Sequence, residues 1–296
     1  MPNQGLKILK YARFCPFCEL FFVPLQGKTN NMAKKILFIN QEIVPYVPES
    51  ELSLMGKALP QAMLENAHEI RTFMPKWGNI NERRGQLHEV IRLSGMNLII
   101  DDTDHPLIIK VASIAQTRIQ VYFIDNDDYF SKRQMTANEA GEDYADNGER
   151  AIFFARGVLE TVKKLRWVPD IIHVQGWMGA VVPIYVKTAY HDEPSFANTK
   201  VVTSLFPNNL KSELGDNFKK IVEFRDAKAS LLKKYNDHFD FNELCKLAID
   251  YSDGVVAGSK DVSKSLMKYA ADNNIPTLAY AGEDFGNAYE EFYEKI

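Results

Sequence analysis

The chain has 296 residues, of which 46% are hydrophobic and 25% are charged, a composition typical of a globular protein. Its net charge is −4; residues 1–31 carry +3, so residues 32–296 carry −7. An acidic body without a dense run of Lys or Arg argues against nucleic acid as the main partner. No apolar run reaches the roughly eighteen residues that a spanning helix needs, so we expect no membrane partner.

The first 31 residues differ from the rest of the chain. They contain a basic start and the pair Cys15 and Cys18 in CPFC; the third cysteine is Cys245. This low, odd count fits a reducing compartment, and we expect a cytoplasmic protein. We interpret residues 1–31 as an N-terminal extension, disordered or not native, with Met32 as the start of the folded chain. A targeting segment and a functional Cys-x-x-Cys pair are the alternatives.

From Met32 the hydrophobic pattern alternates between strand and helix. Residues 35–40 form a short apolar run typical of a buried parallel strand. Residues 52–65 have helical spacing, and residues 70–74 predict a second strand. Three β-like stretches separated by short loops then predict an antiparallel ribbon, at 90–93, 107–111 and 119–124.

The second half of the chain continues this alternation. Residues 147–165 are the clearest helix, because apolar residues recur on one face. Further strands are predicted at 170–174, 200–205, 254–257 and 276–281. Further helices are predicted at 178–190, over most of 210–252, and at 260–271 and 287–295. The pattern predicts an α/β fold with a Rossmann-like, mostly parallel sheet and helices on both faces, as a single domain over 32–296.

Several stretches match one protein family in order and spacing. They are KILF (35–38) with EIVPYV (42–47), GKALP (56–60) with HEIR (68–71) and MPKWG (74–78), YFID (122–125) with YF (129–130) and DYADNGERAIFF (143–154), PDIIHVQGW (169–177) and, more weakly, LAIDYSDGVVAGS (247–259). Together they resemble the N-terminal half of the glycogen/starch synthase family of glycosyltransferases.

This resemblance implies the N-terminal half of a GT-B fold, in which two Rossmann-like domains face a cleft. Family members transfer glucose from ADP-glucose to an α-1,4-glucan with retention, and they use neither a metal nor another cofactor. The N-terminal domain mainly holds the acceptor, and the C-terminal domain holds most of the donor. The family enzyme is nearly twice as long as this chain, so we expect the acceptor-side domain only.

The sequence departs from the family at positions that carry chemistry. The family loop E-x-x-P-F-x-K-x-G-G-L places a Lys and two Gly residues at the donor pyrophosphate, where this chain has Pro48, Ser50 and Glu51. Proline supplies neither charge nor N–H, and one like-charge pair at about 5 Å costs roughly 3 kcal/mol at an effective dielectric of 20. The histidine and aspartate of H-A-H-D-W are Gln175 and Gly176 here. We therefore expect a degenerate donor loop and poor catalysis by the chain alone.

The resemblance also suggests candidates for sugar or acceptor binding, each with a structural alternative. His173 lies where open α/β sheets bind ligands, or it is a strand-end histidine packed under Trp177. Trp177 stacks on a sugar or anchors the core, and Gln175 can still hydrogen-bond. The remaining candidates are Asp146 and Asn147, which could instead cap a helix, together with Arg150 and Glu42. The histidines show no metal-ligand spacing, so no metal site is predicted.

Two hypotheses about function follow from the resemblance. In the first, the chain is a catalytically impaired, acceptor-side relative of glycogen synthase that binds α-glucan, or works with a separate donor-domain protein or by self-association. In the second, it is a non-catalytic glucan-binding domain that regulates or scaffolds glycogen metabolism. A Rossmann-like protein adapted to another small ligand is a third, weaker reading. Whether the chain is an enzyme is left open by the sequence.

Overall fold

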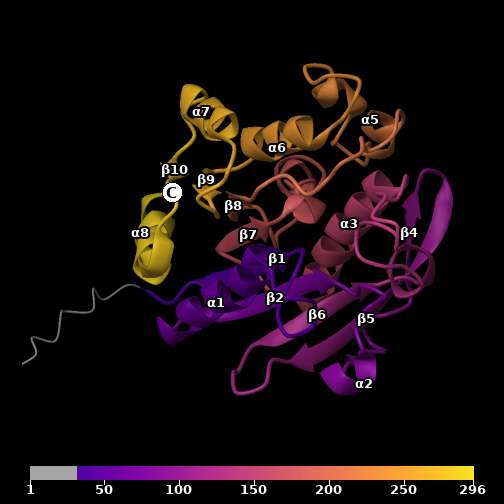
Figure 1. Ribbon diagram of the computed structural model, residues 1–296, viewed down its shortest axis with the longest axis horizontal. Coiled ribbons are helices and arrows are strands. Elements are labelled where there is room, and N and C mark those ends of the chain that lie inside the picture. Colours follow the sequence, from indigo (N-terminus) through magenta and orange to yellow (C-terminus); the bar gives the residue numbers. More distant parts are fainter. Residues whose placement is uncertain (1–31) are drawn as a thin grey trace, which may run out of the picture. The chain divides into compact units, whose positions relative to one another are not determined.

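A computed structural model describes residues 32–296, and Ala33–Ile296 form one compact unit (Figure 1). The interpretation of residues 1–31 lies outside the described residues. The strands are β1 (Lys35–Asn40), β2 (Glu69–Pro75), β3 (His88–Glu89), β4 (Met96–Ile100), β5 (Thr103–Ser113), β6 (Gln120–Asp125), β7 (Ile171–Gln175), β8 (Lys200–Leu205), β9 (Gly254–Ala257) and β10 (Thr277–Leu278). The main helices are α1 (Glu51–Glu65), α2 (Glu82–Gly85), α3 (Asn147–Leu165), α4 (Val182–Lys187), α5 (Phe218–Ile221), α6 (Phe241–Asp250), α7 (Lys264–Asp272) and α8 (Phe285–Lys295).

The strands form a mixed sheet in the order β10-β9-β8-β7-β1-β2-β6-β5-β3, with β4 paired to β5. Every neighbouring pair from β10 to β6 is parallel, and β5 pairs antiparallel with β6, β3 and β4. The predicted fold class is therefore confirmed, and two of the three stretches predicted for the ribbon, 107–111 and 119–124, correspond to the antiparallel pair β5 and β6. Strand order reverses between β1 and β7, because the chain leaves β1 toward β2 and returns on the other side. Such a switch point is where open α/β sheets bind ligands.

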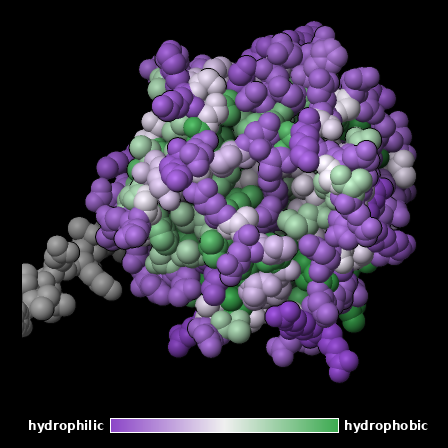
Figure 2. Space-filling view, viewed as in Figure 1, coloured by the Kyte–Doolittle hydropathy of each residue, from purple (hydrophilic) through white to green (hydrophobic). Residues whose placement is uncertain are grey.

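Helices cover both faces of the sheet. On one face, α1 and α8 pack together on β1, β7, β8 and β9 through a cluster that includes Phe38, Leu59, Tyr289 and Phe292. On the other face, α3, α4 and α6 cover a larger cluster. The face of the molecule seen in Figure 2 is largely hydrophilic, with hydrophobic surface in scattered areas. Within residues 32–296, none of the helices combines the length and apolar character that crossing a bilayer requires.

Four predicted elements were wrong or too long. Residues 90–93 form a turn in which Leu93 is buried and Ile91 is exposed, so their apolar run does not mark a strand. Between 210 and 240 only the single turns α5 and η3 (Ala229–Leu232) are helical, and the left-handed backbone at Gly215 (φ +93°) and Arg225 (φ +49°) interrupts a longer helix. The predicted helix 178–190 is divided into a 3-10 turn, η2 (Trp177–Gly179), and α4, and the last strand keeps only the two residues of β10.

Candidate functional site

A cavity of about 200 Å³ opens at the carboxyl ends of β1, β7 and β8, beside the switch point. We call it the strand-end pocket. Loop segments after these strands supply its walls, together with the first turn of α1 and one side of α6. Its lining residues are Glu42, Ser50, Glu51, Leu52, Gly176, Trp177, Ala180, Thr203, Ser204, Leu205, Phe206, Pro207, Asn209, Phe241, Cys245 and Ala248.

The strand-end pocket is mostly apolar, with its charge confined to two carboxylates. Glu42 and Glu51 are acidic, and no Lys, Arg or His is among the described residues that line the cavity. Burial raises the pKa of the Cys245 thiol, so that side chain packs as a small apolar group. The pocket therefore favours a ligand that is neutral or cationic and that presents hydroxyl or N–H groups to a carboxylate.

The loop between β1 and α1 is held in place by local hydrogen bonds. Ser50 caps α1: its hydroxyl accepts the Ser53 N–H at 2.9 Å, and the Ser53 hydroxyl accepts the Ser50 N–H at 2.8 Å. Helix and loop approach so closely that a Cβ on Gly56 would lie 2.2 Å from the Glu42 carbonyl oxygen. Only glycine fits there, and the start of α1 is thereby fixed against the pocket.

Glu42 occupies the place at the start of α1 where an anion would be attracted. Its carboxylate accepts the Ser50 hydroxyl at 2.7 Å and the Gln41 amide Nε2–H at 3.3 Å. Burial raises the pKa of Glu42, and these two hydrogen bonds oppose the shift. Helix N-termini favour negative ligands, but here a side chain of the protein already supplies the negative charge.

A second, more open cavity of about 590 Å³ adjoins the strand-end pocket, and we call it the outer groove. Glu42 and Ser50 line both cavities and separate them. The rest of the outer groove comes from loop residues on either side: Pro48, Glu49, Asn79, Gln134, Met135, Thr136, Ala137, Asn138 and Glu139. Its described lining is also without a cationic side chain, and it offers amide, hydroxyl and carboxylate groups.

Comparison with known proteins places this architecture in a family. The model of the starch synthase catalytic domain matches residues 35–278, most of the chain. The chain belongs to the starch synthase catalytic domain family. The recognition made from the sequence motifs is confirmed.

Relatives of this starch synthase-type domain include the glycogen synthases of Chlorobium luteolum and Chlorobaculum tepidum, each 38% identical over 172 residues. That alignment covers 58% of this chain and 35% of either relative. The solved catalytic domain of starch synthase IV from Arabidopsis thaliana, bound to ADP and acarbose, has a similar fold with a TM-score of 0.67 and 16% identity. The fold match covers 84% of this chain and 51% of the plant domain.

His173 of this starch synthase-type domain is fully buried on the α8 face of the sheet and does not line either cavity. Its Nδ1 lies 2.6 Å from the Tyr293 hydroxyl and its Nε2 lies 2.7 Å from the Ser204 hydroxyl. The imidazole packs against Phe38 and Tyr289. It therefore packs beneath α8 and not beneath Trp177, and burial lowers its pKa to about 3.

Gln175 and Gly176 end β7 at the switch point. Gln175 is fully buried, and within residues 32–296 neither atom of its side-chain amide has a hydrogen-bond partner. Gly176 has φ +88°, and a Cβ there would lie 2.8 Å from the side chain of Gln41. Both the backbone conformation and the lack of space require glycine, so the aspartate of the family motif does not fit this loop.

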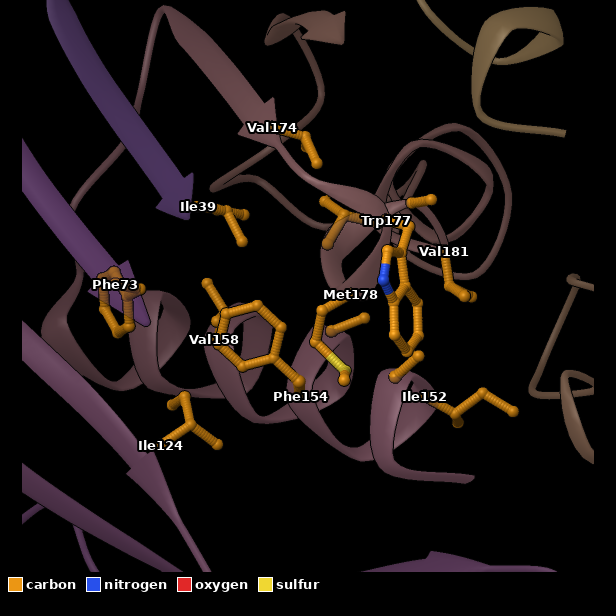
Figure 3. Close-up of a cluster of buried hydrophobic side chains, with 14 of the residues drawn as sticks. Ile39, Phe73, Ile124, Ile152, Phe154, Val158, Val174, Trp177, Met178 and Val181 are labelled. Carbon is orange, nitrogen blue, oxygen red and sulfur yellow. The ribbon is translucent and has the colours of Figure 1, made fainter. Parts of the chain in front are cut away.

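Trp177 and Phe206 form part of the apolar wall of the pocket. Trp177 is 3% exposed, and its ring extends into the core beside Met178 and Val181 (Figure 3). Met178 is fully buried in the same cluster and does not line the pocket. Phe206 packs on Gly258, where a Cβ would lie 2.6 Å from the ring. Trp177 thus anchors the core, and the edge that reaches the pocket is what a ligand could contact.

The three candidates at the start of α3 brace a loop. Asp146 occupies the N-cap position without a side-chain cap hydrogen bond, and its carboxylate pairs with Arg133 at 2.6 Å. Arg150 is buried and donates to the carbonyl oxygens of Tyr129 and Met135 and to the Asn147 side chain. These bonds hold the loop after β6, whose residues 134–139 line the outer groove. The candidates therefore lie behind a cavity wall and shape it from inside.

Sequence reasoning missed the contribution of α6 to the site. Phe241, Cys245 and Ala248 reach the pocket from α6, and Thr203 and Ser204 reach it from the end of β8. Residues from a helix far along the chain carry no local signal of a pocket. The position of Ser204 at the carboxyl end of a predicted parallel strand was the one available indication.

Proposed function

We propose that this chain binds the end of an α-1,4-glucan, with a terminal glucose unit in the strand-end pocket and the following units in the outer groove. The observation that carries the proposal is the composition of the two cavities at the switch point. They join carboxylate, amide and hydroxyl groups to an apolar wall and, in the described part of the chain, present no cation. Neutral sugars offer hydroxyl groups to such acceptors and C–H faces to aromatic edges.

The relatives support this ligand class. Those matched over 172 residues are glycogen synthases, and the plant domain of similar fold was solved with acarbose and ADP. The chain spans 35% of the length of those relatives, so transfer of glucose is part of the proposal and needs its own test.

We infer further that the chain alone does not use ADP-glucose efficiently. A diphosphate at the strand-end pocket would meet Glu42 and Glu51 without a neighbouring Lys or Arg among the lining residues. Stabilisation of developing charge usually supplies the largest share of catalysis. Glucosyl transfer would therefore need a separate polypeptide that supplies the donor-side cations, or the chain acts only as a glucan-binding regulator or scaffold.

Two assays of the purified chain test these statements. Co-sedimentation with glycogen is expected to deplete the chain from the supernatant, and failure to sediment at millimolar glucose units would contradict glucan binding. Incubation with radiolabelled ADP-glucose and glycogen is expected to give no incorporation above a boiled control. Incorporation by the chain alone would refute the inferred lack of transfer but leave glucan binding intact.

A further inference from the structure

A chain of hydrogen bonds connects α8 to the strand-end pocket. The Tyr293 hydroxyl lies 2.6 Å from His173 Nδ1, His173 Nε2 lies 2.7 Å from the Ser204 hydroxyl, and that hydroxyl lies 3.3 Å from the Tyr289 hydroxyl. All four residues are at most 3% exposed. Ser204 also lines the pocket, so the chain begins inside the protein and ends at the cavity.

The hydrogen of the Tyr293 hydroxyl has one available acceptor. Among the described residues, its hydrogen-bond partner is His173 Nδ1 alone. A buried O–H left without an acceptor costs about 1–3 kcal/mol, so Tyr293 donates to Nδ1. Burial holds the pKa of His173 at about 3, so the ring is neutral and carries one hydrogen. With Nδ1 accepting, that hydrogen lies on Nε2 and is donated to the Ser204 oxygen.

The hydroxyl hydrogen of Tyr289 can be assigned from its available acceptor in the same way. Within residues 32–296, its hydroxyl has Ser204 as its hydrogen-bond partner, so its hydrogen also goes to the Ser204 oxygen. Both lone pairs of that oxygen are then occupied, and its own hydrogen has no acceptor among its described partners. Ser204 is also one of the residues that line the strand-end pocket, where a ligand can accept this hydrogen.

We propose that His173, held by Tyr293 as the Nε2–H tautomer, fixes Ser204 as a hydrogen-bond donor directed into the strand-end pocket. Tyr293, Tyr289 and His173 are positioning residues in this arrangement, and Ser204 touches the ligand. Helix α8 thus determines that Ser204 donates a hydrogen bond into the pocket and does not accept one there. Ser204 donates on one wall, and Glu42 accepts on another.

This arrangement specifies which hydrogen-bonding groups the ligand must present. The inference rests on the proposed glucan binding. The ligand must place an acceptor oxygen at Ser204 and a donor at Glu42. A neutral molecule with several hydroxyl groups satisfies both, because each hydroxyl donates and accepts. A phosphate offers acceptors only and would leave the Glu42 carboxylate opposed to a like charge.

The tautomer can be measured on the unmodified chain without any ligand. In ¹⁵N–¹H correlation spectra of the histidine side chains, His173 is expected to show a protonated Nε2 and an unprotonated Nδ1, unchanged between about pH 5 and 8. A protonated Nδ1 would overturn the proposal, because Ser204 would then donate to His173. This result does not depend on whether glucan binds.

The ligand contact is tested by a substitution in β8 and a matched control just before the start of that strand. Ser204→Ala removes the free donor and should weaken maltotriose binding about tenfold, a loss typical of one hydrogen bond. Thr199→Val is the control: Thr199 directly precedes β8, lines neither cavity, and its buried hydroxyl donates to the Pro169 carbonyl. The affinity of this control variant for maltotriose should stay within twofold of that of the unmodified chain.

The outcomes separate this proposal from the glucan proposal. Equal maltotriose affinity for Ser204→Ala and the unmodified chain would overturn donation by Ser204. If maltotriose does not bind the unmodified chain while His173 carries its hydrogen on Nε2, glucan binding fails and the assigned direction of the hydrogen bonds is supported.

Discussion

Two buried titratable side chains flank the switch point, and burial shifts their pKa values in opposite directions. Glu42 has a raised pKa and His173 a lowered one, because in both cases removal from water disfavours the charged form. Each therefore makes stability depend on pH in its own window. Glu42 lines the strand-end pocket and His173 contacts Ser204, which also lines it. The change of stability with pH in these two ranges therefore reports on the side chains around the pocket.

His173 should make the chain sensitive to mild acid. Its pKa falls from 6.5 to about 3 on folding, so the unfolded chain binds more protons between these values and stability falls as pH drops below 6.5. From pH 7 to 4.5 this term removes roughly 2 to 3 kcal/mol. His173→Asn should be less stable at pH 7 but should lose less stability over that interval in urea titrations. The exposed His88→Asn should follow the unmodified chain, and parallel curves for all three would contradict the assignment.

Glu42 should act in the opposite sense. Its folded pKa is raised above 4.5, so the folded chain binds more protons than the unfolded chain, and stability falls as pH rises through that window. Glu42→Gln removes the buried charge and keeps an acceptor for Ser50. We expect a higher urea midpoint than the unmodified chain at pH 7 and no such gain at pH 4. Glu89→Gln, at an exposed position on β3, should change neither; a lower midpoint for Glu42→Gln at pH 7 would show that the carboxylate is stabilising.

At the scale of elements, α8 closes one face of the sheet. Tyr289, Phe292 and Tyr293 are buried against α1 and the central strands, and the Glu290 carboxylate lies 2.8 Å from His68 Nε2. Phe292 packs directly on Gly254 of β9, where a Cβ would lie 2.8 Å from the ring. The helix that carries the positioning tyrosines is therefore fixed by close contact with the sheet.

The contact between α8 and β9 predicts that substitution by alanine changes stability differently at two glycines. Gly254→Ala should destabilise the chain by about 1–3 kcal/mol, because the added methyl overpacks against Phe292. Combining it with Phe292→Leu should cost less than the sum of the two single changes, as measured by a double-mutant cycle in urea. Gly286→Ala in α8 is the control: its Cβ would lie 3.6 Å from Ala62, an ordinary contact, so stability should hold or rise. Additive single effects would mean that α8 is not docked on β9 in solution.

The elements also show how far a sequence pattern can be taken. Strands β1, β2, β7 and β8 were predictable because each contains a short apolar stretch, two residues long or more, of the kind that is typical of buried parallel strands. The run 90–93 has the same character, but a turn buries Leu93. Glu42 and Trp177 were found at the site because they follow strands directly, whereas Cys245 and Ala248 come from α6 and carry no local signal. The burial of His173 under α8 depends on contacts 120 residues apart in sequence, which no local period reveals.

For the whole molecule, charge decides which class of ligand the cavities at the switch point favour. Residues 32–296 carry −7, and both cavities at the switch point are acidic. This field disfavours a diphosphate and leaves a neutral sugar unaffected. Salt should therefore have little effect on maltotriose affinity, because no ion pair forms with a neutral ligand.

The charge argument predicts that affinity for ADP can be raised by two substitutions, one in the loop before α1 and one at the first residue of that helix. Pro48→Lys with Glu51→Gly adds a cation and removes a carboxylate, a change of +2 in net charge. Two such changes near a diphosphate are worth on the order of 2 kcal/mol, or about thirtyfold in affinity. Isothermal titration with ADP should detect this gain at low salt and a smaller gain at high salt. Glu89→Lys makes the same +2 change on β3, at the far edge of the sheet, and should leave ADP affinity near that of the unmodified chain. An equal gain from Glu89→Lys would mean that net charge alone governs ADP binding, and no gain from the loop variant would mean that the strand-end pocket excludes the nucleotide by shape.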